Sequence, residues 1–451
     1  MMAVWSEVLY SELTDDYRLD AEFYRPEYLH QSEVIHSMRH DLLANLADVS
    51  DGNHISIAEN FTDEGVRYLR GQDLSDFFVS DKDPIHLPCS AYQTLRRSHM
   101  KTGDVLLGIV ATIGTVSLVT DRFDKLTGNC KIAIVRPKTI ESEYLAAYFS
   151  SLIGQREIHR RARGTVQTGV ILPDLKALPI AIPGDSTRKA IVEKVQGSYK
   201  QRQESLAKYA EAEGLLSSAL GLDGLDLTAR LFYERPYADL EAASRFDAEY
   251  FQPPKKAVLD ALAKMPGEPV SVQFRSVRQL WQPDKVNAAE PVRNYDLTDA
   301  LQPFLDDTTE PVTPDAISST KKRLKKGDLV VSRLRSYLKE IAVVQDNGPI
   351  PMVGSTEFIV LRPEKGALAV ETLMVYLRSL PVQTILKWSQ DGSNHPRFDE
   401  NELLNLRIPD AVREHETAIA GKVRESFAAR REARRLLDEA KRMVEEAILG
   451  A

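Results

Sequence analysis

The stretch RLDAEFYRPEY, residues 18–28, returns near the middle of the chain as RFDAEYFQPPK, residues 245–255. The identities within this stretch and before it share a constant offset of 227 positions. Tyr10, Leu13, Arg18, Asp20, Ala21 and Glu22 recur as Tyr237, Leu240, Arg245, Asp247, Ala248 and Glu249. Self-similarity at a fixed offset is the signature of a repeated structural unit. The offset is half of the 451 residues, so the chain contains two copies of one unit.

Further blocks repeat in the same order. KTGDVLLGIVATIGTVSLV (101–119) is followed by KKGDLVVSRLRSYLKEIAVV (325–344), and GNCKIAIVRPK (128–138) by GSTEFIVLRPE (354–364). LPIAIP, which ends at Pro183, is matched by LRIP, which ends at Pro409. An ordered set at a nearly constant offset indicates a tandem duplication of the whole chain.

Each copy begins with short β-type runs between Gly, Pro, Asp and Asn, a pattern typical of a mixed sheet with long loops. The expected strands are 105–109, 115–119 and 132–135 in the first copy, and 329–332, 341–344 and 358–361 in the second. One short helix is expected near 143–160 and another near 370–388. The fold class is therefore α+β, with two tandem mixed α/β domains, each followed by a long helix.

The pattern becomes helical after each closing proline. Apolar residues spaced by four and seven lie on one stripe of a helix, as a helix–helix seam requires. The seam residues are Ile191, Val195, Tyr199, Tyr209, Leu216 and Leu220 in the first helix, and Ile419, Val423, Phe427, Leu437, Val444 and Ile448 in the second. Gly221 and Gly450 suit left-handed C-caps.

These features predict four segments: a first domain over 1–185, a helix over 186–222, a second domain over 223–410 and a helix over 411–451. Two matching apolar stripes in one chain favour pairing with each other. We expect an antiparallel coiled coil with pseudo-twofold symmetry. The alternative is that each helix packs on its own domain.

The composition is that of a globular chain, with 43% hydrophobic and 27% charged residues and a net charge of −8. No apolar run reaches the about 18 residues of a membrane span. The N-terminus MMAVWSEVLYSEL lacks the basic and apolar regions of a signal peptide. Cys89 and Cys130 form no C-x-x-C pair, which fits a reducing cytoplasm, and we expect both to be buried thiols.

Motifs for catalysis are missing from the sequence. It has no G-x-x-x-x-G-K-[ST], G-x-G-x-x-G, H-E-x-x-H, G-x-S-x-G or Cys/His cluster, and no Asn/Asp-Pro-Pro-aromatic loop of an amino-methyltransferase. We therefore expect a chain without catalytic residues, cofactor or metal of its own. A carboxylate-rich nuclease site stays open as an alternative, because 66 acidic residues allow many pairings.

Basic, Gly-flanked segments recur at equivalent places while their residues differ, as in REIHRRARGTVQTG (156–169) and KWSQDGSNHPRF (387–398). Arg and Lys neutralise phosphates and pair with guanine, while Gln and Asn pair with adenine. The candidate DNA-binding residues are Arg70, Gln72, Arg97, Lys101, Arg160, Arg161, Arg163, Thr165, Gln167 and Thr168 in the first copy, and Lys322, Arg323, Arg333, Arg335, Lys339, Ser393, Asn394, His395 and Arg397 in the second. The alternatives are a solvated charged face and simple connecting loops.

This organisation resembles the specificity subunit of type I restriction-modification systems. KTGDVLLGIVATIG and KKGDLVVSRLRS look like the Gly-Asp strand signature of that family, and LPDLKALPIAIP and FDENELLNLRIP look like its closing segments. The resemblance covers essentially the whole chain. One departure is that Asp185-Ser186 and Asp410-Ala411 stand where family members often carry Glu-Gln after the proline.

The resemblance implies two target-recognition domains that read a bipartite, asymmetric site in double-stranded DNA for phage defence. It also implies partners: methyltransferase subunits, two in number, that bring S-adenosylmethionine for DNA methylation, and an ATP- and Mg-dependent restriction and translocation subunit. The rival hypotheses are a stand-alone DNA-modifying or DNA-cleaving enzyme and a protein–protein adaptor that does not bind DNA.

If the paired helices set the distance between half-sites, their length should determine the unread spacer. Four extra residues add about 6 Å to a helix, and DNA advances about 3.4 Å per base pair. Insertions near residues 203 and 431 together should therefore lengthen the preferred spacer by one or two base pairs. Site selection from duplexes with variable spacers measures this. An unchanged spacer after both insertions would mean that the helices are not the ruler.

Overall fold

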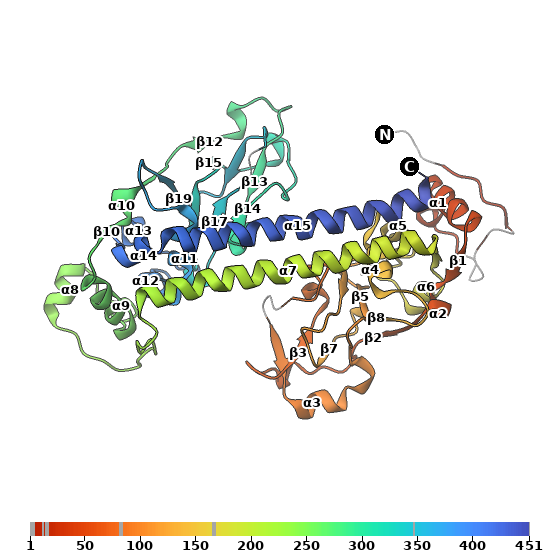
Figure 1. Cartoon of the computed structure of the whole chain (residues 1–451), viewed down its shortest axis with the longest axis horizontal. Coiled ribbons are helices and arrows are strands. Elements are labelled where there is room, and N and C mark those ends of the chain that lie inside the picture. Colours follow the sequence, from red (N-terminus) through yellow and green to blue (C-terminus); the bar gives the residue numbers. More distant parts are fainter. Residues whose placement is uncertain are drawn as a thin grey trace. The chain divides into compact units, whose positions relative to one another are not determined.

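The computed structural model describes residues 5–10, 13, 18–80, 84–164, 168–345 and 348–450. The chain divides into two compact units (Figure 1). Unit 1 comprises Met1–Gln203 and Ala429–Ala451, and unit 2 comprises Glu204–Ala428. The division falls inside both long helices, so each unit contains one globular part and a segment of each helix. None of the helices described is both long enough and apolar enough to cross a membrane.

Unit 1 is built around a four-stranded antiparallel sheet in the order β2-β8-β5-β6. Its strands are β2 (Ala47–Asp51), β8 (Ile132–Pro137), β5 (Val105–Gly108) and β6 (Val116–Leu118). A second sheet joins β4 (Ile85–Leu87), β3 (Val66–Leu69) and β7 (Leu126–Gly128), and a two-stranded sheet joins β1 (His40–Leu42) to β9 (Pro179–Ala181). The helices of the globular part are α1 (Pro26–Ser37), α2 (Leu43–Leu46), α3 (Cys89–Thr94), α4 (Ser142–Ser150), α5 (Leu152–Arg160) and α6 (Leu172–Lys176).

Unit 2 repeats this topology in the order β11-β19-β16-β17, to which β14 is added at the edge. The strands are β11 (Phe274–Ser276), β19 (Phe358–Pro363), β16 (Leu329–Ser332), β17 (Ile341–Val344) and β14 (Phe304–Leu305). The other sheets are β12 (Leu280–Trp281), β15 (Lys321–Leu324), β18 (Met352–Gly354) and β13 (Arg293–Tyr295), and β10 (Gly267–Pro269) with β20 (Arg407–Pro409). The helices are α8 (Tyr237–Ala243), α9 (Pro253–Ala263), α10 (Val270–Gln273), α11 (Val370–Arg378), α12 (Leu380–Trp388), α13 (Glu400–Leu404) and α14 (Asp410–Glu414).

The expected strands are confirmed within a residue or two, but the expected single helices are wrong. Each is a pair, α4 with α5 and α11 with α12. Ser151 and Ser379 interrupt them in extended conformation, with ψ of 163° and 150°. The Ser151 hydroxyl accepts the amide of Gly154 and so caps a new helix. In the second copy Pro381 occupies the first turn after the break, a position that proline favours.

The repeated Gly-Asp motif is explained by an ion pair inside each unit. Asp104 accepts two bonds from the Arg136 guanidinium, 2.8 and 2.7 Å long, and Asp328 accepts two from Arg362, both 2.7 Å. Both carboxylates are buried, with 1% of the side chain exposed. Gly327, before Asp328, has a φ of 84°, which glycine adopts without steric cost. The motif therefore fixes a turn against the neighbouring strand.

In unit 1 the first half of α7 (Asp185–Leu220) packs against the second half of α15 (Glu416–Leu449). The Lys194 ammonium lies 2.8 Å from the Glu439 carboxylate, and the Ser198 hydroxyl donates to the Ala433 carbonyl at 2.7 Å. Residue numbers rise along one segment as they fall along the other, so the segments are antiparallel. The unit 1 core includes Ile191, Val195, Ala440, Val444 and Ile448 together with the sheet and α4.

Unit 2 contains the remaining helical segments, which are also antiparallel. The Ser426 hydroxyl donates to the Ser205 carbonyl at 2.7 Å, and Lys422 lies 2.7 Å from the Glu211 carboxylate. The core of this unit includes Leu216, Leu220, Ile419, Val423 and Phe427. In each unit, a segment of α7 packs against a segment of α15, and both also pack on the globular part of that unit. Helix–helix pairing and packing of the helices on a domain therefore occur together. A single coiled coil with pseudo-twofold symmetry stays a prediction.

The seam residues lie where the stripe predicts them. Nine are buried, and Tyr199, Tyr209 and Leu437 are partly buried against the same cores. Gly221 and Gly450 have φ of 60° and 69°, so the left-handed C-caps are confirmed. The second long helix begins at Glu416, after α14 and His415, and not at 411.

The prediction of two buried thiols is wrong. Cys89 is exposed because it begins the short surface helix α3, directly after Pro88. Cys130 is partly exposed because it lies in the turn between β7 and β8.

Asp328→Ala should destabilise unit 2 by about 3–5 kcal/mol, because it leaves the partly buried Arg362 without its carboxylate partner. Denaturant unfolding followed by the fluorescence of buried Trp281 measures the change. The control is Asp260→Ala on α9, which breaks an exposed ion pair with Lys256 and should cost less than about 1 kcal/mol. Equal effects of both substitutions would contradict the structural role of the Gly-Asp motif.

Candidate nucleic-acid interface

The candidate loop of unit 2 spans residues 391–397 and is closed at its base by two backbone bonds. The Asp391 amide donates to the Arg397 carbonyl at 2.8 Å, and the Arg397 amide donates back at 2.9 Å. Gly392 has a φ of 95° and turns the chain away from the base. The residues at the tip, Ser393, Asn394 and His395, are exposed. A polar tip on a fixed base can present its side chains to a ligand.

The connection between β16 and β17 lies against this loop. The Arg335 amide donates to the Pro396 carbonyl at 2.9 Å, and the Arg335 guanidinium donates to the Asn394 carbonyl at 3.2 Å. Arg335 and Lys339 have φ of 49° and 54°, a conformation that non-glycine residues rarely adopt. The structure thus brings together two segments that lie about sixty residues apart in sequence.

Glu357 holds two of the predicted arginines. Its carboxylate accepts bonds of 3.0 and 2.8 Å from Arg397 and one of 2.9 Å from Arg333. The bond from Arg397, with that from Arg333, lowers the pKa of Glu357 to about 2 against the opposing effect of burial. Lys322 lies nearby and donates to the Phe358 carbonyl at 2.6 Å, and burial lowers its pKa. These cations are held in defined orientations.

Unit 1 contains an equivalent loop over residues 163–169. The Arg163 amide donates to the Gly169 carbonyl and the Gly169 amide donates back, both at 2.8 Å. Gly164, with a φ of 106°, corresponds to Gly392 at an offset of 228. Thr168 is exposed, and the predicted Thr165 and Gln167 lie outside the described residues. The two loops therefore have equal length and the same closure.

The turn that carries Arg70 and Gln72 lies beside the β5–β6 connection of unit 1. The Thr112 hydroxyl of the β5–β6 connection donates to the Gly71 carbonyl at 3.1 Å. The same connection is bonded to the residue after loop 163–169, because the Val170 amide donates to the Ile109 carbonyl at 2.9 Å. Arg70 is engaged by Asp73 at 2.7 Å, whereas Gln72 is exposed.

Sequence reasoning missed Lys131, which is exposed and lies next to Gly71. It occupies the position that corresponds to Glu357, at the same offset of 226 as the surrounding block. The two copies thus carry opposite charges at equivalent sequence positions. The alignment of the two copies contained this signal.

Arg160 and Arg161 are corrections to the predicted set, because both are buried. Arg161 donates to the Glu157 carboxylate at 2.5 Å, and the Arg160 guanidinium lies 4.1 Å from the centre of the Phe23 ring and donates to the Phe23 carbonyl. Burial lowers the pKa of Arg160. These arginines stabilise unit 1 and are not available to phosphates. Arg163 is partly exposed at the loop base, paired with Asp174 at 2.7 Å.

The remaining predicted cations lie on strands and turns. The Arg97 side chain is 70% exposed and pairs with Asp51 at 2.7 Å. Lys101 is exposed at the first Gly-Asp turn, and Arg323 is partly exposed on β15.

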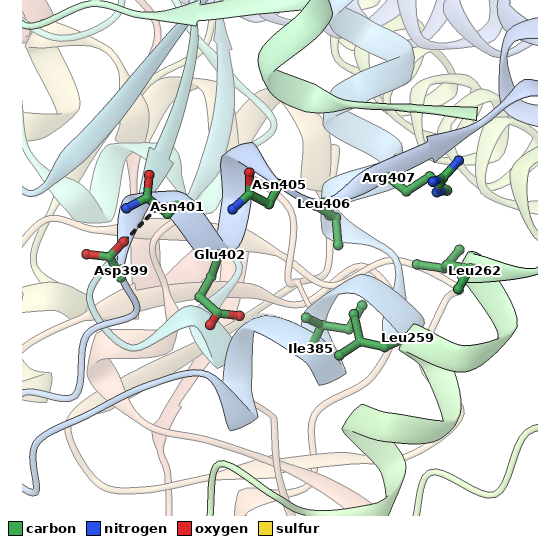
Figure 2. A pocket seen from close by; sticks show the side chains of 10 residues that line it. Leu259, Leu262, Ile385, Asp399, Asn401, Glu402, Asn405, Leu406 and Arg407 are labelled. Atoms are coloured by element: carbon green, nitrogen blue, oxygen red, sulfur yellow. Dashed lines mark hydrogen bonds between the residues drawn. The ribbon is translucent and has the colours of Figure 1, made fainter. Parts of the chain in front are cut away.

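A cavity of about 340 Å³ lies between α9, α12 and α13 of unit 2 (Figure 2). Leu259, Leu262 and Ile385 form its apolar side. The Asp399 carboxylate is engaged by the Asn401 amide at 2.8 Å, and the Glu402 carboxylate accepts the Tyr250 hydroxyl at 2.9 Å. Among the described residues, no group of three or more His, Cys, Asp or Glu side chains is placed to hold a metal ion.

No protein-family model matches the sequence, and no curated protein matches it. Comparison with solved structures finds the S subunit of a type I restriction-modification system from M. genitalium, with 13% identity and a TM-score of 0.44 over 91% of this chain and 96% of that one. The chain is similar to a type I S subunit. The HsdS subunit from Thermoanaerobacter tengcongensis aligns with 14% identity and a TM-score of 0.29 over 91% and 96% of the two chains. A third structure, which concerns complex assembly and conformational transition of the type I R-M system, aligns with 14% identity and a TM-score of 0.29. The alignment covers 91% of this chain and 97% of that one.

Glu357→Gln should loosen loop 391–397, because it removes the charge that holds Arg333 and Arg397. We expect amide exchange at Asp391 and Arg397 to accelerate about tenfold, which corresponds to about 1.4 kcal/mol, while Val330 inside β16 stays protected. In the wild type, the pKa of Glu357 is lowered from 4.5 to about 2 in the folded state. The stabilisation of the loop by Glu357 should therefore be complete above pH about 4.5 and be lost as the pH falls towards about 2. Lys131→Met is the matched control and should leave Arg163 and Gly169 unchanged. Equal exchange in wild type and Glu357→Gln would refute the role of Glu357.

Proposed function

We propose that this chain is a sequence-specific DNA-recognition subunit that reads a bipartite, asymmetric target and directs methyltransferase subunits to adenines in it. The observation that carries the proposal is the pair of loops 163–169 and 391–397. Both have the same length, closure and glycine turn, but the residues between the closures differ. One scaffold that presents two different polar loops suits the reading of two different half-sites.

Charge supports the proposal locally, although the net charge is −8. Arg333, Arg335 and Lys339 lie on one connection against the second loop, and Lys131 and Gln72 lie near the first. Such groups can contact phosphates while the loop tips reach base edges. S-adenosylmethionine, and ATP and Mg where a restriction subunit is present, would belong to the partner subunits.

The proposal is tested by site selection from random duplexes with the reconstituted complex. Asn394→Ala should change the base preference in one half-site, at a cost of about 1–3 kcal/mol if the amide pairs with a base. Thr168→Ala should change only the other half-site. Turnover of DNA by the purified chain would favour the stand-alone enzyme. Weak, sequence-blind binding that disappears at moderate salt would favour the adaptor.

A further inference from the structure

Residues that recur in both copies lie beside the two candidate loops. In unit 1 the Arg18 guanidinium donates to the Asp20 carboxylate at 2.9 Å and to the Ala162 carbonyl at 2.9 Å. It lies 4.5 Å from the centre of the Phe23 ring. The Arg18 side chain is only 5% exposed. It therefore joins the N-terminal segment to the residue that precedes Arg163 and the loop.

Unit 2 contains the same arrangement, built from its own residues. Arg245 donates two bonds to Asp247, 2.8 and 2.6 Å long, and lies 4.3 Å from the centre of the Tyr250 ring. It also donates to the carbonyls of Ser389 and Gln390, at 3.3 and 3.2 Å. Gln390 precedes the loop of unit 2 as Ala162 precedes that of unit 1.

The carbonyls that these arginines contact follow the ends of α5 and α12. A basic side chain near the C-terminus of a helix interacts favourably with the helix dipole. The planar guanidinium presents its donors in a fixed fork, so one arginine can hold a carboxylate and a carbonyl in a defined relative orientation. The direction in which the chain leaves the helix is thereby fixed one residue before the loop begins.

We call each set of an arginine, its aspartate and the aromatic ring that it contacts a clamp: Arg18, Asp20 and Phe23 in unit 1, and Arg245, Asp247 and Tyr250 in unit 2. The two copies differ in their loops but agree in this clamp. GTVQT and GSNHP occupy positions 164–168 and 392–396, whereas Arg, Asp and a following aromatic residue are present in both copies. A group that selects bases would differ between the loops, and a group that orients any loop would not. The agreement therefore assigns the clamp to loop orientation.

We propose that Arg18 and Arg245 are positioning residues, each of which sets the orientation of its own unit's loop and through it the base preference of that loop, without touching DNA. The proposal rests on the proposed function. It adds residues that lie about 145 positions before the loops in sequence and that sequence reasoning did not include among the DNA-binding candidates.

The test is site selection with the reconstituted complex of the full chain, using Arg18→Met and Arg245→Met. Arg245→Met should lower the preference for the best base about tenfold in the half-site that Asn394→Ala affects, and leave the other half-site and the affinity for random DNA unchanged. Arg18→Met should act only on the half-site that Thr168→Ala affects. Arg245→Lys should fall between wild type and Arg245→Met, because lysine keeps the charge but not the fork.

Asp247→Asn provides a second variant that keeps the arginine. If both residues act through one clamp, Arg245→Met combined with Asp247→Asn should be no worse than Arg245→Met alone. If Arg245→Met does not fold, Arg245→Lys and Asp247→Asn are tested in its place. Each should lower the base preference only in the half-site that Asn394→Ala affects.

Full preference in both half-sites for folded Arg18→Met and Arg245→Met would overturn the positioning role. Equal loss in both half-sites from one substitution would also overturn it, because that is the result of general destabilisation. Absence of any site preference in the wild type would instead refute the proposed function. The two failures are therefore distinguishable.

Discussion

Val444 and Ile448, close to the end of the chain, are buried in the same core as Ile191 and Val195 and the first sheet. Unit 1 therefore cannot complete its core until the last helix has been made. A buried aliphatic side chain contributes about 1.5–3 kcal/mol through the apolar surface that it removes from water. Several such residues on the α15 segment amount to a large share of the typical stability of a domain. The stability of unit 1 thus depends on the contacts between α15 and the rest of the unit, although these segments lie far apart in the sequence.

The same dependence explains why the two long helices show such regular apolar stripes. In unit 2 the α7 residues Leu216 and Leu220 share a core with Ile419 and Val423 of α15. Each helix must therefore fit two different cores along its length. A stripe with a period of 3.5 to 3.6 residues keeps one face directed to the interior throughout.

Much of this fold could be predicted from the sequence, because the duplication gave two versions of every pattern. Strands 329–332 and 341–344 were expected with the bounds that the structure has, since β-type runs between turn residues are locally determined. The break at Ser151 was missed because serine is compatible with a helix, and only its capping bond to Gly154 shows otherwise. In the second copy Pro381 offered a visible signal of a break.

The candidate site was harder to predict, because charge alone does not reveal exposure. Arg161 is wrong as a DNA contact, because Glu157 lies four residues before it, a spacing at which opposite charges pair on a helix. That pairing could have been read from the sequence. The bonds of Arg397 and Arg333 to Glu357 could not, because they join segments whose proximity depends on the β-sheet. The loops themselves were identified because basic residues and glycines recur in both copies.

The closure of the loops has a consequence for how such a protein can change. In each unit the bonded pairs 163/169 and 391/397 enclose a stretch of five sequence positions, and the first of the five is a glycine with a positive φ. Substitutions among the other four positions leave the bonds at the base intact. New loop sequences can thus arise without a new fold. Because backbone bonds close each loop, substitutions at the loop positions that would alter recognition should change the stability of the fold little.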